Sequence, residues 1–109
     1  LNMVWVELAD KNYANTGLKA PVFFKSKMQR TRVFVDVDEG KIQLEYSYDT
    51  PFKCKKLKRE MQWQKLESGF IENDFAFEML GISAVRLRVL NAGKQGARVH
   101  VFQNVTEEK

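Results

Sequence analysis

Hydrophobic and polar residues alternate along most of this chain, most clearly between residues 75 and 103. Apolar side chains recur at every second position in segments 75–79, 85–89 and 97–101, with small or charged residues between them. A period of two places one set of side chains on the buried face of a β-strand and the other set in water. The intervening segment 91–96 contains Gly93 and Gly96 and is typical of a turn. We therefore predict a β-hairpin that joins strands at 85–89 and 97–102.

The same alternation predicts strands in the rest of the chain. Segments 31–37 and 41–48 flank the short turn Asp38-Glu39-Gly40, and we expect them to form a second hairpin. Further strands are expected at 3–8, 21–24 and 61–66, whereas the polar segments 9–19 and 53–60 are predicted to be loops or irregular edges. About eight short strands with turn signals roughly every 8–12 residues favour a sandwich. We expect residues 1–109 to form a single all-β domain, an antiparallel β-sandwich of the jelly-roll kind.

The apolar positions of the alternating strands also predict the core. Of the 109 residues, 44% are hydrophobic and 12% are aromatic, which is enough material for one core filled with large rings. We predict that five side chains are largely buried: Phe34, Leu44, Phe77, Leu87 and Val99.

Charge is concentrated in one place. The chain has 18 basic and 14 acidic residues, a net charge of +4, and five of the basic residues fall within seven positions: Lys53, Lys55, Lys56, Lys58 and Arg59. Such a run indicates contact with phosphate, an acidic protein surface or an anionic glycan. The alternative is a solvated edge or loop, where lysines discourage strands from pairing edge to edge. If the run is an interface, an acidic segment such as Asp36-Val37-Asp38-Glu39 of a neighbouring copy is a candidate partner.

No catalytic constellation stands out. The chain lacks a nucleophile elbow, a phosphate-binding loop, a zinc-ligand spacing and a Rossmann glycine fingerprint. The one histidine, His100, has no second ligand at metal-site spacing, and the one cysteine, Cys54, allows no intrachain disulfide. Asp36, Asp38 and Glu39 could hold a hard cation, but carboxylates at a turn are ordinary turn formers. We expect no enzymatic activity, no catalytic residues, no cofactor and no metal.

The order of features resembles that of small β-sandwich proteins in the virions of tailed bacteriophages. The similarity covers most of the chain. It rests first on a loop that ends in Gly and Pro, at Gly17 to Pro21, and on a strand followed by a Trp, at Ile42 to Asp49 with Trp63. A Ser-Gly turn follows at Ser68-Gly69, and the last two strands are rich in valine, at Val85 to Val89 and Val99 to Phe102. The chain departs from this pattern in its lysine run, where a shorter turn is expected. The resemblance implies a non-enzymatic structural protein, a capsid decoration or a head–tail or tail adaptor component.

That resemblance also implies the partners and location. We expect a homo-oligomer that docks on other virion structural proteins, with the cytoplasm as the alternative location. No run approaches the roughly 20 apolar residues that span a bilayer, so no membrane partner is expected.

Two other functions stay open. One is a carbohydrate-binding module, which would need exposed aromatic side chains in a coplanar row; the candidates are Trp5, Tyr13, Tyr46, Tyr48 and Trp63. The other is a nucleic-acid-binding module that uses the basic run at 53–59, whose affinity would fall steeply with salt.

Overall fold

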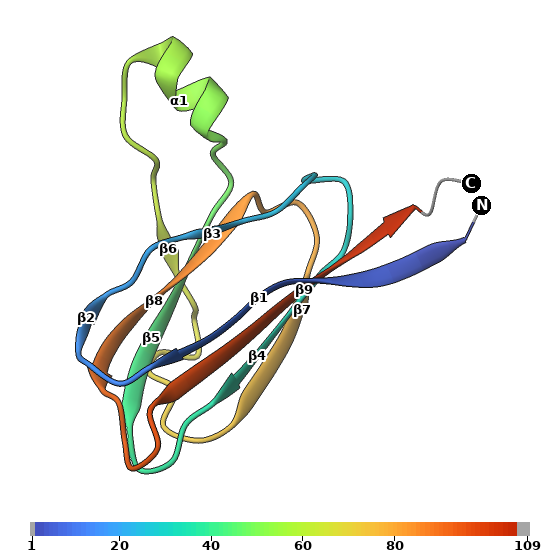
Figure 1. The fold of residues 1–109 in the computed structure, drawn as a ribbon. Coiled ribbons are helices and arrows are strands. Elements are labelled where there is room, and N and C mark those ends of the chain that lie inside the picture. Colours follow the sequence, from blue (N-terminus) through green and yellow to red (C-terminus); the bar gives the residue numbers. More distant parts are fainter. Residues whose placement is uncertain (1, 107–109) are drawn as a thin grey trace.

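Two antiparallel sheets packed face to face make up the computed structural model, which describes residues 2–106 (Figure 1). The first sheet has the strand order β1-β9-β4-β7, with β1 at Met3–Tyr13, β9 at Ala97–Thr106, β4 at Thr31–Asp36 and β7 at Phe75–Met79. The second has the order β2-β8-β5-β6, with β2 at Gly17–Leu18, β8 at Ala84–Asn91, β5 at Lys41–Ser47 and β6 at Gln64–Lys65. A short strand, β3 at Val22–Phe23, also pairs with β8.

These strand orders are those of a jelly roll once β2 and β3 are counted as one interrupted strand. The chain folds like a long hairpin whose strands pair from the outside inward: β1 with β9, β2 and β3 with β8, β4 with β7, and β5 with β6. Successive pairs belong alternately to the first and the second sheet, so the long hairpin is wrapped around the core. The predicted fold class, an antiparallel sandwich of the jelly-roll kind, is confirmed.

Both predicted hairpins are wrong. Strands β8 and β9 lie in different sheets, and so do β4 and β5, so the turns between them are arches that cross from one sheet to the other. The two arches touch: the N–H of Lys94 donates to the carbonyl of Asp38 at 3.0 Å. Gly93, with a φ of +76°, allows this approach, because a Cβ there would overlap the Asp38 carbonyl oxygen. Alternation shows which side chains face inward, but it does not identify the partner strand.

The core lies between the sheets and is built from alternating aliphatic side chains. Val33, Val35, Val99 and Val101 of the first sheet meet five side chains of the second: Ile42, Leu44, Val85, Leu87 and Val89. All nine are at most 3% exposed. The predicted burial of Leu44, Leu87 and Val99 is therefore confirmed.

Two of the predicted core residues behave differently. Phe77 is half-buried and packs against the edge of the core. Phe34 is 41% exposed, so its predicted burial is wrong. Side chains of β4 alternate between the two faces of the sheet, and Val33 and Val35 point inward. Phe34 therefore shares the outward face with Arg32 and Asp36.

The first strand is longer than its composition predicts. Segment 9–19 was expected to be a loop, but β1 continues through the polar residues Asp10, Lys11 and Asn12 to Tyr13. These residues pair with 97–100 of β9, beyond a register shift between Glu7 and Ala9. Backbone pairing with β9 therefore outweighs the low strand propensity of these residues.

Candidate functional site

A projecting arm is the most distinctive feature outside the sandwich. The chain leaves the second sheet after β5 and returns to it at β6, and residues 50–61 between them stand away from both sheets (Figure 1). Helix α1 at Pro51–Leu57 forms the tip of this arm. Because β5 and β6 are the innermost pair of the folded long hairpin, the arm is the tip of that hairpin.

The helix contradicts the expectation of an irregular loop at 53–60. Thr50 caps its N-terminus by accepting a hydrogen bond from the N–H of Lys53 at 3.2 Å, and Pro51 occupies the first turn. Lys58 ends the helix in the left-handed conformation, with a φ of +54°. The Thr-Pro pair is a helix-start signal that is visible in the sequence, and it outweighs the repulsion among the lysines.

A network of hydrogen-bonded polar groups holds the base of the arm. Both carboxylate oxygens of Asp49 accept hydrogen bonds from the guanidinium of Arg59, at 2.9 and 3.0 Å. The N–H of Gln62 also donates to Asp49 at 2.8 Å, and the hydroxyl of Ser47 donates to the carbonyl of Gln62 at 2.7 Å. The hydroxyl of Ser83, the residue before β8, shares its proton between the carbonyls of Ser47 and Asp49. The two ends of the arm are thereby joined to each other and to the second sheet.

This network also fixes the charge of Asp49. Asp49 is only 8% exposed. The Arg59 guanidinium, assisted by the N–H of Gln62, holds the pKa of Asp49 below its ordinary value, and the same contact raises the pKa of Arg59. Both groups therefore stay ionised at neutral pH, and the arm keeps its ion-paired base.

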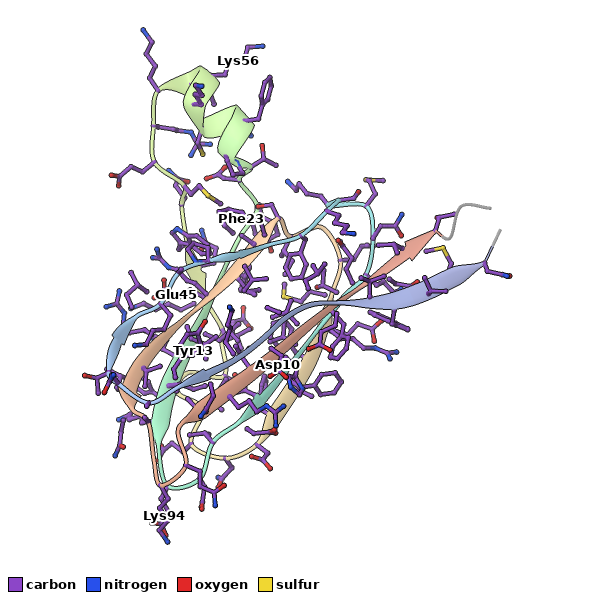
Figure 2. The ribbon with its side chains drawn as sticks, viewed as in Figure 1. Asp10, Tyr13, Phe23, Glu45, Lys56 and Lys94 are labelled. Atoms are coloured by element: carbon purple, nitrogen blue, oxygen red, sulfur yellow. The ribbon has the colours of Figure 1, made fainter. Side chains whose placement is uncertain are left out.

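The structure divides the five predicted site residues into two groups. Lys53, Lys55, Lys56 and Lys58 are exposed on the arm, and no ion pair reaches any of them within residues 2–106. Arg59 instead forms the ion pair with Asp49 and belongs to the base of the arm. Figure 2 shows Lys56 at the tip, directed away from the sheets.

Apolar side chains accompany the lysines, and sequence reasoning missed them. Phe52 is 78% exposed and Leu57 is 54% exposed, both on α1. Of the residues of this helix, only Cys54 is buried. A helix at the tip of an arm has too little protein around it to cover its remaining faces. The arm therefore presents four cations and two large apolar groups to the solvent, a combination suited to docking on an acidic protein surface.

Four of the five candidate aromatic residues make contacts within the molecule that involve their rings. The guanidinium of Arg32 lies over the Trp5 ring at 4.0 Å, and that of Arg86 lies over the Trp63 ring at 4.2 Å. The rings of Tyr46 and Tyr48 meet edge to face, at 85°. Stacking on a sugar requires a free aromatic face, whereas each tryptophan has a cation on one of its faces.

Three possible metal ligands meet on the outer face of the first sheet. Glu7, Asp10 and His100 each offer an atom within 4.8 Å of the others, because β1 pairs with β9 there. Nε2 of His100 lies 2.7 Å from Asp10, outside hydrogen-bonding geometry. Arg98 already binds both oxygens of Asp10 at 2.9 and 3.0 Å and lowers the pKa of Asp10. We assign no metal to this cluster, since its carboxylates are exposed and the negative charge of Asp10 is already balanced by Arg98.

Of the three candidate cation ligands Asp36, Asp38 and Glu39, Glu39 is directed to a different partner. Asp36 and Asp38 line a hollow beside the arches, whereas Glu39 forms an ion pair with Lys94 at 3.2 Å.

Comparison of the chain with known protein families, with curated proteins and with solved structures finds no match. Within residues 2–106, no helix is long and apolar enough to cross a membrane.

Proposed function

We propose that this protein is a non-enzymatic structural component of a virion, of the capsid-decoration or head–tail or tail adaptor kind. It acts by docking its basic arm on an acidic protein surface. The observation that carries the proposal is the arm itself, a capped helix with four exposed lysines that is anchored at its base. The jelly-roll fold supports the proposal only by analogy, because the fold serves both viral capsid proteins and lectins.

The design of the arm favours docking over a role in stability. Its exposed side chains lie outside the core, so burial within this molecule does not account for them. Phe52 and Leu57 supply apolar surface that a partner can bury, and the lysines select a partner of opposite charge. The anchored base keeps the arm in one orientation, which reduces the entropy lost on docking.

Nucleic acid is the second candidate partner, because four exposed lysines on a short helix also suit phosphate groups. In that case the logarithm of the affinity would fall linearly with the logarithm of the salt concentration, with a slope of about −0.9 per phosphate contacted in duplex DNA. The docking proposal predicts no binding of a DNA duplex at an ionic strength of about 0.15 M, where screening is already substantial.

Charge reversal on the arm tests the proposal. The variant Lys55→Glu, Lys56→Glu, Lys58→Glu should lose concentration-dependent association in sedimentation velocity, while its melting temperature stays near that of the unmodified protein.

A matched control places the same change elsewhere. Lys11, Lys25 and Lys65 are exposed residues of the sandwich, and their replacement by Glu changes the net charge equally. This control should associate as the unmodified protein does. Equal association of the arm variant and the unmodified protein would contradict the proposal.

A further inference from the structure

A hollow lined by carboxylates lies at the arch end of the sandwich. It has a volume of about 640 Å³, and its charged lining residues are Asp10, Asp36, Asp38, Asp74 and Arg98. It opens beside the arches, since it is also lined by Gln95 and Gly96 of the arch between β8 and β9, which is the second arch along the chain. Its volume falls within the range of about 300–1,000 Å³ that is typical of protein binding pockets.

The charge of this hollow is strongly one-sided. Arg98 forms a two-point ion pair with Asp10, so these two charges cancel. Asp36, Asp38 and Asp74 remain, and within residues 2–106 none of the three has an ion-pair partner. Asp74 accepts a hydrogen bond from the N–H of Val37 at 3.1 Å, which uses one of its two oxygens. Three negative charges therefore face the solvent in a concave surface.

The arm offers the complementary charge. Lys53, Lys55 and Lys56 lie on the short helix α1, Lys58 follows it as the C-cap, and all four side chains are exposed. Each of these side chains is a flexible stem with a strongly hydrated cation that gains a carboxylate partner on docking. The exposed ring of Phe52 adds apolar surface next to the cations.

The two surfaces lie at opposite ends of the molecule. Figure 2 shows Lys56 at the tip of the arm and Lys94, a residue of the second arch, at the far end of the sandwich. The hollow lies beside that arch, so the arm cannot reach the hollow of its own chain. A contact between them must join two molecules.

We propose that the basic arm of one copy docks in the acidic hollow of a second copy, so that copies of this chain associate head to tail. The inference rests on the proposed docking function and identifies the partner of the arm. Such a contact uses two different surfaces, the arm and the hollow. A linear series of copies therefore has a free arm at one end and a free hollow at the other. Repeated contacts therefore close into a ring or extend as a filament, according to the angle between neighbours.

A charge-swap experiment tests this pairing. The first variant carries Lys55→Glu, Lys56→Glu and Lys58→Glu on the arm, and the second carries Asp36→Lys and Asp38→Lys in the hollow. Each variant alone places like charges at the contact and should associate at least roughly tenfold more weakly than the unmodified protein. An equimolar mixture should associate again, because the acidic arm of one variant fits the basic hollow of the other, and the native arm fits the native hollow.

Sedimentation velocity gives the association state, and circular dichroism of each variant confirms that it is folded. If the hollow variant is unfolded, Asp36→Asn with Asp38→Asn replaces it; this pair should weaken association without reversing the charge. Recovery of association in the mixture supports the inference.

The remaining outcomes separate the inference from the function on which it rests. Loss of association in the arm variant with full association of the hollow variant overturns the inference alone, because the arm then docks elsewhere. Association that neither variant changes overturns both the inference and the proposed function.

Discussion

The contact between the two arches gives the sharpest test of the fold, and it depends on Gly93. Replacing Gly93 with Ala adds a Cβ that overlaps the carbonyl oxygen of Asp38, at a residue whose φ is +76°. The Asp38 carbonyl also accepts the hydrogen bond from the N–H of Lys94, so the substitution disturbs a backbone hydrogen bond between the arches.

Gly69 provides a matched control. Its φ is +81°, close to that of Gly93, but a Cβ on Gly69 would meet no atom within 4 Å. Ala in the left-handed region costs about 1–2 kcal/mol. The lower entropy of the unfolded chain offsets about 0.4–1 kcal/mol of that cost. We therefore expect Gly69→Ala to lower the free energy of unfolding by about 0–1.6 kcal/mol.

Gly93→Ala should cost considerably more than this control. Displacing the Asp38 carbonyl weakens a hydrogen bond worth about 0.5–1.5 kcal/mol, and forcing a methyl group into a packed site costs about 1–3 kcal/mol. The difference between the two variants should therefore be about 1.5–4.5 kcal/mol. A domain of this size has a stability of about 5–15 kcal/mol, so both variants should remain folded.

Urea unfolding followed by tryptophan fluorescence measures both free energies, with equal m-values as the check on two-state behaviour. All variants are compared at one protein concentration in high salt, since self-association would otherwise add to the apparent stability. Equal costs for Gly93→Ala and Gly69→Ala, within about 0.5 kcal/mol, would show that the arches do not touch as described.

Four further predictions concern the core, the outer face of the first sheet, the base of the arm and the buried thiol. Leu87→Ala should lower the free energy of unfolding by about 2–5 kcal/mol in urea titrations, because the side chain is only 3% exposed. The Phe34 ring meets the Phe102 ring edge to face, with 5.7 Å between the ring centroids. Phe34→Ala should therefore cost no more than about 1.5 kcal/mol, the value of such an aromatic pair, and a larger loss would place Phe34 in the core. The lowered pKa of Asp49 stabilises the fold fully above the ordinary value of 3.8, and this stabilisation is lost as the pH falls from 3.8 through the folded-state pKa. Over that pH range, the melting temperature of Asp49→Asn should therefore decline less than that of the unmodified protein. Cys54→Ser should leave folding and association unchanged, and dependence of the oligomer on oxidant would contradict this.

The sequence predicts the fold class well because burial in strands is encoded locally. The alternation of Val85, Leu87 and Val89 shows which face of β8 is inward, and the structure agrees. The partner of a strand is a tertiary property, however. Nothing in the sequence of segment 91–96 distinguishes a hairpin from an arch, and only the strand pairing of the folded chain shows that β8 and β9 lie in different sheets.

The candidate site is predictable in part. The cluster of basic residues is evident from composition, but the role of Arg59 is not, because its partner Asp49 precedes the helix that separates them. The helix itself has a recognisable start at Thr50 and Pro51. The acidic hollow combines Asp36, Asp38 and Asp74 from segments that are distant in sequence, so only the strand pairing of β4 with β7 and the arches brings them together.

The central claim is that this protein works by docking its copies or partners through the arm, and the mass of the unmodified protein in solution tests it most directly. Light scattering across a range of protein concentrations should give a mass that rises above the 12.7 kDa of one chain. The mass should fall toward 12.7 kDa when the salt concentration is raised from about 0.1 M to about 1 M, because the screening length then shortens from about 10 Å to about 3 Å. A mass of 12.7 kDa at every protein concentration in low salt would contradict self-association through the arm.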